Sequence, residues 1–372
     1  MQPWCALAPA HVLAYRHSAS PPPPTAAGAV LFFHGFGMHA RAERYAALYA
    51  SLASRSLAVF AWDMPSHGCS ARDACASLAR AASCPACDAG ADAGADAGAD
   101  ARADAGADAG ARADAGEGAL PAALHVEEAS LVRHAHALVA AVRREYGACA
   151  PLVLVGESMG AGVAMRVAAE LGAAAASHHR LAGVCTLAGM VGTASPALDD
   201  GERPSPRRFP RARPSARSPA RSLARALEDA SVVARLLAAG ARAAASSPAA
   251  RAEARAAARD PLMRPWRMAR PSTWARAARC HRELLERVDY AQVRAPVLAV
   301  AGSRDVLYSP ARTLATLRRC VAASDVELRV VRDGHTLATT SDEAREACAR
   351  FCEAACVRAA RVRRREDEEG DK

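Results

Sequence analysis

The segment 152–165 constrains the fold of this chain more than any other. It reads Leu-Val-Leu-Val-Gly-Glu-Ser-Met-Gly-Ala-Gly-Val-Ala-Met, a short apolar run, then a turn of small residues, then a helix-like run. Ser158 lies in the turn between Gly156 and Gly160. Glycine suits both flanking positions because the backbone of a strained turn passes close to itself and leaves no room for side chains. The pattern predicts a strand, a sharp turn and a helix, with the Ser158 hydroxyl held above the edge of a sheet.

Two later predicted strands are followed by side chains that complement a serine. The apolar run 296–302 is the first, and Asp305 follows three residues after it; residues 326–332 are the last strand, and His335 lies just beyond it. A serine hydroxyl is a poor nucleophile at neutral pH, so a base must take its proton. His335 would be that base, and Asp305 would hold the imidazole in the correct tautomer. Serine, aspartate and histidine in this order, each past a strand end, follow the order of the α/β-hydrolase triad.

Two other acidic residues lie at the ends of predicted strands, and we rank both below Asp305. Asp333 stands only two residues before His335 and precedes a glycine turn, so we interpret it as capping the loop. Asp63 ends the apolar run 57–63 but precedes Ser158 in the chain, which does not fit the expected order. We interpret Asp63 as a structural anchor for the loop 63–70.

The run 29–35 ends in His34-Gly35, and Phe36 follows. A loop of this type after an early strand supplies one backbone donor of an oxyanion hole. The second donor would be the backbone N–H of Met159, at the N-terminus of the helix that follows Ser158, where developing negative charge is stabilised. The sequence therefore predicts the amides of Phe36 and Met159 as the oxyanion donors.

Taken together, these motifs resemble the monoacylglycerol lipase and lysophospholipase group of serine hydrolases. The resemblance rests on the stretches 34–39, 60–70 and 156–160, and Glu157 is similar to the residue that the plant-type branch carries before its serine. It implies an α/β-hydrolase that cleaves a carboxylic ester through an acyl-enzyme on Ser158, with a monoacylglycerol or lysophospholipid as the lipid ester substrate. It implies neither a metal nor an organic cofactor, and it leaves the substrate-binding residues unassigned.

Two other functions use the same features. An acyltransferase would use the same triad with an alcohol as acceptor in place of water. A non-catalytic protein of the same fold would bind a small ligand, although the intact set of Ser158, Asp305 and His335 argues against this reading.

Composition limits the partners and the compartment. The formal net charge is +9, yet the only lysine is Lys372, so nearly all of the positive charge is arginine. We attribute this one-sided usage to nucleotide composition, and no basic patch with interleaved aromatic residues indicates a nucleic-acid partner. There is no apolar run of about eighteen residues and no basic leader followed by an apolar core, so neither a transmembrane helix nor a secretory signal is expected. We therefore expect a cytoplasmic protein with reduced thiols.

The chain divides into a core and several additions. We expect residues 1–189 and 276–360 to form one α/β core, a mostly parallel sheet flanked by helices. The Asp-Ala-Gly-Ala repeat at 88–118 has no apolar face and would be a disordered acidic insert. Residues 190–275 would form an inserted helical cap, partly disordered, and residues 361–372 a charged tail.

The sequence of the predicted cap allows two interpretations, one of which involves a membrane. Residues 223–257 mix Ala, Leu, Val and Arg with helical spacing, while 199–222 is rich in Pro, Ser and Arg. Such a helix either packs on the core or lies on a membrane surface with its arginines toward phosphates. Peripheral membrane contact through the cap is thus one of two readings.

Overall fold

The structure is a computed structural model of the chain. It describes residues 1–7, 12–22, 25–65, 67–68, 127–174, 181–189, 251–252, 255, 259–260, 280, 283–305, 308–320 and 325–370. The predicted insert at 88–118 and nearly all of the predicted cap at 190–275 lie outside these residues, so both stay predictions.

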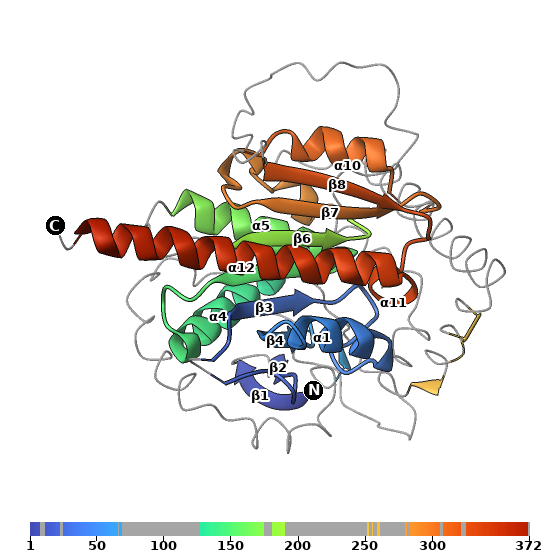
Figure 1. Ribbon diagram of the computed structural model, residues 1–372. Coiled ribbons are helices and arrows are strands. Elements are labelled where there is room, and N and C mark those ends of the chain that lie inside the picture. Colours follow the sequence, from blue (N-terminus) through green and yellow to red (C-terminus); the bar gives the residue numbers. More distant parts are fainter. Residues whose placement is uncertain are drawn as a thin grey trace, which may run out of the picture.

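An eight-stranded sheet runs through the centre of the molecule (Figure 1). Its strands are β1 (Gln2–Leu7), β2 (Val12–Arg16), β3 (Gly28–Phe33), β4 (Leu57–Trp62), β5 (Leu152–Glu157), β6 (Gly183–Leu187), β7 (Val297–Gly302) and β8 (Val326–Val331). They are arranged in the order β1-β2-β4-β3-β5-β6-β7-β8. β2 is antiparallel to both of its neighbours, and the strands from β4 to β8 are parallel. This confirms the predicted mostly parallel α/β sheet.

The central strands are buried along their whole length, from β3 through β7. Their sequences are continuous apolar runs, as expected of parallel strands that helices cover on both faces. β8 is different: its residues are mostly partly or fully exposed, because it forms one edge of the sheet.

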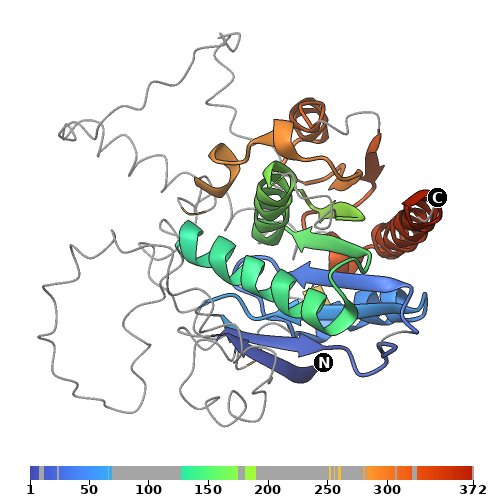
Figure 2. The same cartoon turned by 90° about the vertical axis from the view of Figure 1, so that its left-hand side faces the viewer.

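Helices cover both faces of the sheet (Figures 1 and 2). They are α1 (Ala46–Ala53), α4 (Glu128–Tyr146), α5 (Met159–Ala173), α10 (Pro310–Leu317), α11 (Leu337–Thr340) and α12 (Asp342–Gly370), with short 3₁₀ helices η1 (Glu43–Tyr45) and η6 (Tyr290–Gln292). α1 and α12 share one apolar core with one face of the sheet, and α4 and α5 share the other.

Sequence spacing explains how two of these helices dock. α4 turns Leu131, Ala135, Leu138 and Val142 toward the sheet at intervals of three and four residues. α12 presents small residues instead, and its buried face includes three cysteines, Cys348, Cys352 and Cys356. A Cβ atom added to Gly28 would lie 2.4 Å from the sulfur of Cys356, so α12 packs directly against the backbone of β3. These thiols serve as small packing groups.

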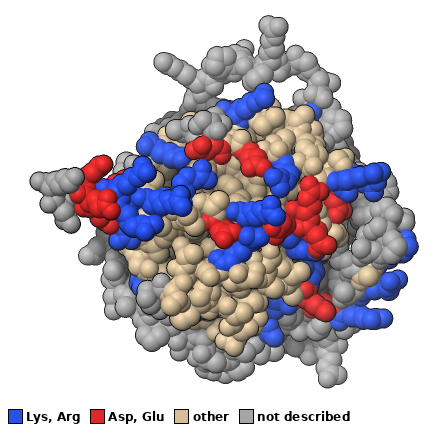
Figure 3. Space-filling view, in the orientation of Figure 1, with Lys and Arg blue, Asp and Glu red and all other residues tan. Residues whose placement is uncertain are grey.

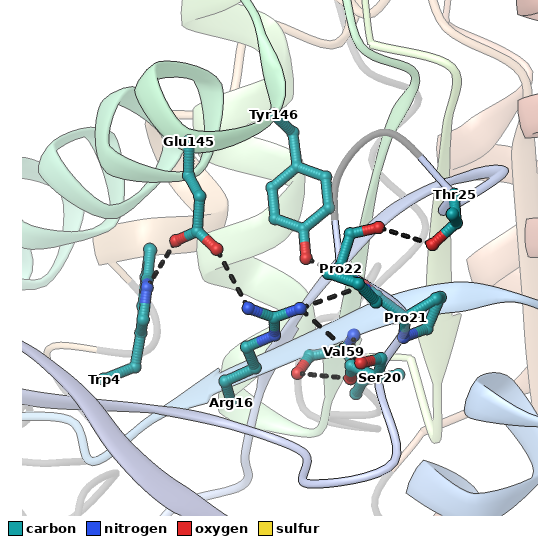
Figure 4. Close-up of polar contacts among 9 residues, drawn as sticks. All are labelled: Trp4, Arg16, Ser20, Pro21, Pro22, Thr25, Val59, Glu145 and Tyr146. Atoms are coloured by element: carbon teal, nitrogen blue, oxygen red, sulfur yellow. Dashed lines mark hydrogen bonds and ion pairs between the residues drawn. The ribbon is translucent and has the colours of Figure 1, made fainter.

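A polar network fastens the β1 edge of the sheet to α4 (Figure 4). The Glu145 carboxylate accepts a hydrogen bond from Trp4 Nε1 at 2.6 Å and another from the Arg16 guanidinium at 3.0 Å. Arg16 also donates to the Pro21 carbonyl at 2.9 Å, and Tyr146 donates to the same carbonyl at 3.1 Å. Because Arg16 is partly buried between two elements, its bonds fix the place of the edge strands more than an exposed ion pair would.

The strand β1 (Gln2–Leu7) is one that the sequence pattern did not indicate. That run contains Pro3, which weakens a strand signal, and proline is tolerated there because β1 is an edge strand whose register shifts between Pro3 and Cys5. Within the residues that the structure describes, no helix is both long enough and apolar enough to cross a membrane.

Candidate active site

Ser158 occupies a strained turn between β5 and α5. Its backbone has φ 51° and ψ −120°, a region that residues other than glycine rarely adopt and that costs about 1–3 kcal/mol. The Ser158 N–H donates to the Leu187 carbonyl at 3.1 Å, and the Ser158 carbonyl accepts from Ala161 at 2.9 Å. These bonds tie the turn to β6 and to the first turn of α5. The strained backbone holds the hydroxyl at the carboxyl end of the parallel sheet.

Gly156 and Gly160 make the turn possible. A Cβ atom on Gly156 would lie 2.2 Å from the carbonyl oxygen of Gly160, and one on Gly160 would lie 2.0 Å from the carbonyl oxygen of Phe33. Both contacts are with backbone, which cannot move aside as a side chain can. The two glycines are therefore required by close approach, as the sequence predicted.

Three side chains that are far apart in the sequence meet at this edge of the sheet. His335 Nε2 lies 2.8 Å from Ser158 Oγ, and His335 Nδ1 lies 2.9 Å from Asp305 Oδ2. The Asp305 side chain is 1% exposed and that of His335 is 22% exposed. With the proton on Nδ1 facing the carboxylate, Nε2 has a lone pair for the serine hydroxyl. The predicted members Ser158, Asp305 and His335 are thus brought together in hydrogen-bonding contact.

The two candidate acids, Asp305 and Asp333, make different contacts in the structure. Asp305 faces His335, and its other oxygen accepts the Tyr308 N–H at 3.2 Å. Asp333 instead accepts from the Gly334 N–H at 2.7 Å and from the Thr340 hydroxyl at 2.9 Å, closing the loop around His335. The Tyr308 ring packs beside the imidazole, with centroids 5.3 Å apart, a contact that the sequence did not reveal.

The loop after β3 lies against Ser158. A Cβ atom on Gly35 would sit 3.3 Å from Ser158 Cβ. His34 Nε2 accepts the Met64 N–H at 3.0 Å, so His34 Nδ1 carries the proton and donates to the Gly35 carbonyl at 2.8 Å. The carbonyl and N–H of one trans peptide point in opposite directions, so fixing the Gly35 carbonyl also fixes the direction of the Phe36 N–H.

Met159 is the first residue of α5, so no carbonyl within the helix can accept its N–H. The predicted pair of backbone donors, Phe36 and Met159, is therefore placed on the two segments that flank the Ser158 hydroxyl. An oxyanion attached to a carbon that is bonded to Ser158 Oγ would lie near the positive end of the α5 dipole.

Glu157 is a second residue that the sequence did not single out for a role in the site. Its side chain is buried, accepts the Tyr45 hydroxyl at 2.7 Å and accepts the Ala338 N–H at 3.0 Å. Ala338 lies in α11, three residues after His335. The carboxylate thus connects the serine turn to the segment that carries the histidine. Charge-assisted bonds of this kind are among the stronger ones in a protein.

Asp63 lies against Gly68 in the loop 63–70 that we expected it to anchor, and part of that loop lies outside the described residues. Its carboxylate also accepts the Ala40 N–H at 2.8 Å and the Tyr15 hydroxyl at 2.9 Å. It therefore holds the loop after β3 and the strand β2. On the same loop, His39 Nε2 lies 2.7 Å from Asp260 Oδ2, and Asp260 is one of the few described residues within the predicted cap.

Two buried histidines near this loop should make the folded protein less stable in acid. The rings of His34 and His67 are 5.4 Å apart, and burial lowers the pKa of His34 and lowers that of His67 to about 3. In the unfolded chain a histidine titrates at about 6.5. The unfolded state therefore gains protons that the folded state does not, so stability is complete above pH 6.5 and falls as the pH drops toward 3.

The measurement is the free energy of unfolding in denaturant between pH 7.5 and pH 5. Each buried neutral histidine should add a slope of about 1.4 kcal/mol per pH unit below pH 6. His67→Gln should have a shallower slope than the parent protein. His136→Gln is the control, because His136 is partly exposed and pairs with Glu170 at 2.7 Å. Equal slopes for His67→Gln and the parent would contradict the argument.

Comparison with protein families agrees with this geometry. A family model described as serine aminopeptidase, S33, matches residues 114–337, more than half of the chain, and that stretch includes Ser158, Asp305 and His335. The chain belongs to this family of serine hydrolases with the α/β-hydrolase fold. A comparison with curated proteins found no match.

Solved structures of ester hydrolases share the fold. The monoacylglycerol lipase of Paleococcus ferrophilus is 17% identical with a TM-score of 0.51, and the alignment covers 93% of this chain and 99% of that one. A lipase in its open form is 17% identical with a TM-score of 0.54, covering 93% and 94%. A soluble variant of the monoglyceride lipase of Saccharomyces cerevisiae, in complex with a substrate analogue, is 14% identical with a TM-score of 0.50, covering 94% and 91%. These likenesses show the α/β-hydrolase fold and leave the substrate undetermined.

Proposed function

We propose that this member of the family is a carboxylic ester hydrolase that works through an acyl-enzyme on Ser158. The observation that carries the proposal is the chain of contacts from Asp305 through His335 to Ser158, at 2.9 Å and 2.8 Å. Both distances are within reach for proton transfer or hydrogen bonding.

In the first half of the reaction, Ser158 Oγ attacks the ester carbonyl and His335 Nε2 takes the hydroxyl proton. The carbonyl oxygen becomes an oxyanion, which the N–H groups of Phe36 and Met159 stabilise. The intermediate collapses, the C–O bond to the leaving alcohol breaks, and His335 returns the proton to that alcohol. Asp305 stabilises the imidazolium between the two transfers.

In the second half, a water molecule takes the place of the alcohol. His335 removes a proton from the water as its oxygen attacks the acyl carbonyl. The second intermediate releases the carboxylic acid, and Ser158 Oγ recovers its proton from His335. The net reaction is ester plus water to acid plus alcohol.

We assign the substrate class as a monoacylglycerol or a lysophospholipid. The support is the resemblance of the stretches 34–39, 60–70 and 156–160 to lipases of this kind, together with the lipase names among the fold neighbours. The family description names an aminopeptidase, which would use the same triad on an amide, so amide substrates belong in the test.

A substrate panel on the purified protein tests this assignment. We expect release of fatty acid from 1-monoacylglycerol or lysophosphatidylcholine, and little cleavage of aminoacyl p-nitroanilides. Faster cleavage of the anilides would overturn the ester assignment in favour of a peptidase. Adding glycerol separates the remaining alternatives: transfer products in excess of free acid would indicate an acyltransferase, and inertness toward every substrate would indicate a binding protein.

A further inference from the structure

The C-terminal end of α12 extends beyond the body of the protein. Figure 1 shows the helix continuing past the sheet to the C-terminus. Every residue from 361 to 369 is exposed, and we call this segment the C-terminal extension. It belongs to the tail that we predicted at 361–372, and the structure continues α12 into it as far as Gly370.

The extension has two charged blocks of opposite sign. The first consists of Arg361, Arg363, Arg364 and Arg365, and the second of Glu366, Asp367, Glu368 and Glu369. Figure 3 shows a red group at this end of the molecule beside a group of blue side chains. Among the described residues, the blocks form one ion pair, Arg363 with Asp367 at 3.8 Å, and both of its side chains are more than half exposed. Such a pair contributes little.

The order of the blocks is unfavourable for an isolated helix. Acidic residues occupy the last turn, which carries no basic residue, and that end of a helix bears the negative pole of the dipole. Arginine placed before glutamate at a spacing of four is also the weaker orientation for pairing within a helix. The charges of the extension therefore lack a favourable arrangement within one copy.

An apolar position accompanies these charges. Val362 is 49% exposed and follows Ala355 and Ala359 at spacings of four and three residues. Ala355 is buried against the sheet, so Val362 continues the docking face of α12 into solvent. Contact with a neighbouring helix would remove it from water.

We propose that the extension pairs in an antiparallel manner with the extension of a second copy of this chain. A two-fold axis near the junction of residues 365 and 366 sets the arginine block of each copy beside the acidic block of the other. The two helix dipoles are then antiparallel, which is a favourable arrangement, and both copies use the same surface for the contact. The extension spans nine residues, or about 14 Å. An interface of that length is small, so the dimer is weak and exchanges rapidly.

The position of the extension favours a second copy over a membrane. In Figure 1 it protrudes at the end of the sheet opposite to the carboxyl ends of β3 and β6. The active site lies at those carboxyl ends. A membrane held by the arginines would therefore meet the protein far from Ser158, and the adjoining acidic block would be repelled by anionic lipids.

Charge-block variants test the pairing. One variant replaces the arginine block (Arg361→Glu, Arg363→Glu, Arg364→Glu, Arg365→Glu), and the other replaces the acidic block (Glu366→Arg, Asp367→Arg, Glu368→Arg, Glu369→Arg). All eight positions are exposed, and far-UV circular dichroism and esterase activity verify that each variant is folded. Sedimentation velocity at concentrations on the order of 100 µM, suited to a small interface, measures association.

We expect the parent protein to form dimers at about 0.05 M salt and to lose at least tenfold in affinity at about 0.5 M. Each variant alone should be monomeric, and an equal mixture of the two should recover the dimer. A monomeric parent protein, a variant that dimerises as the parent does, or a mixture that stays monomeric would each overturn the proposal. So would a parent protein that floats with phosphatidylserine vesicles while remaining monomeric, a result that identifies the membrane as the occupant.

Discussion

Ser158→Ala is expected to abolish hydrolysis of a p-nitrophenyl ester, with a fall in kcat on the order of a millionfold. The hydroxyl oxygen that lies 2.8 Å from His335 Nε2 is the only non-hydrogen atom that the substitution removes. Alanine has the same preference against positive φ as serine, so the turn at φ 51° should be kept. We expect the variant to keep its fold, so the loss of activity would reflect the loss of the nucleophile.

A fluorophosphonate probe gives a second measurement of the same variant. The probe phosphonylates an activated serine, so it should label the parent protein at Ser158 and leave Ser158→Ala unlabelled. Ser54→Ala serves as the control, because Ser54 is exposed at the end of α1 and should remain without effect on labelling. Residual hydrolysis near the parent rate in Ser158→Ala, with an unchanged melting temperature, would remove Ser158 from the proposed mechanism.

The sequence predicted those parts of the site that depend on the local backbone and on the order of the strands. Gly156 and Gly160 indicate the serine turn because a Cβ atom at either position would collide with neighbouring backbone atoms. Asp305 and His335 could be placed because the ends of parallel strands gather at one edge of a sheet. The continuous apolar run of β7 marks it as a buried strand of a parallel sheet.

Contacts between side chains of distant segments could not be read in the same way. The bond from Tyr45 to Glu157 joins residues 112 positions apart, and neither has a local pattern that signals the other. Tyr308 reaches His335 only because β7 and β8 are neighbours, which places their following loops together. β1 escaped notice because Pro3 interrupts its pattern, and an edge strand tolerates what a central strand does not. Tertiary packing determines these contacts and this edge strand, and the periodicity of a single sequence carries no information about tertiary packing.

Asp305→Asn is expected to lower kcat by about ten thousandfold with little change in KM. The reason lies in how the Asp305 carboxylate is held on both of its oxygens. One oxygen takes the Tyr308 N–H at 3.2 Å, and the other faces His335 Nδ1 at 2.9 Å. An asparagine must keep its carbonyl oxygen toward Tyr308, because an amide nitrogen there would oppose a donor. Its NH₂ group then faces the imidazole and forces the proton onto Nε2.

A histidine with its proton on Nε2 cannot accept the proton of Ser158, so the variant is folded but slow. Asp333→Asn is the matched control, with the same chemical change two residues from His335. Its carboxylate accepts from Gly334 and Thr340, and an asparagine can keep the bond to one of them. We expect kcat to fall by less than about tenfold there, because Asp333 bonds Gly334 and Thr340 whereas Asp305 faces the imidazole. Steady-state rates normalised to active sites measure both variants, and a larger loss for Asp333→Asn than for Asp305→Asn would reverse the assignment of the acid.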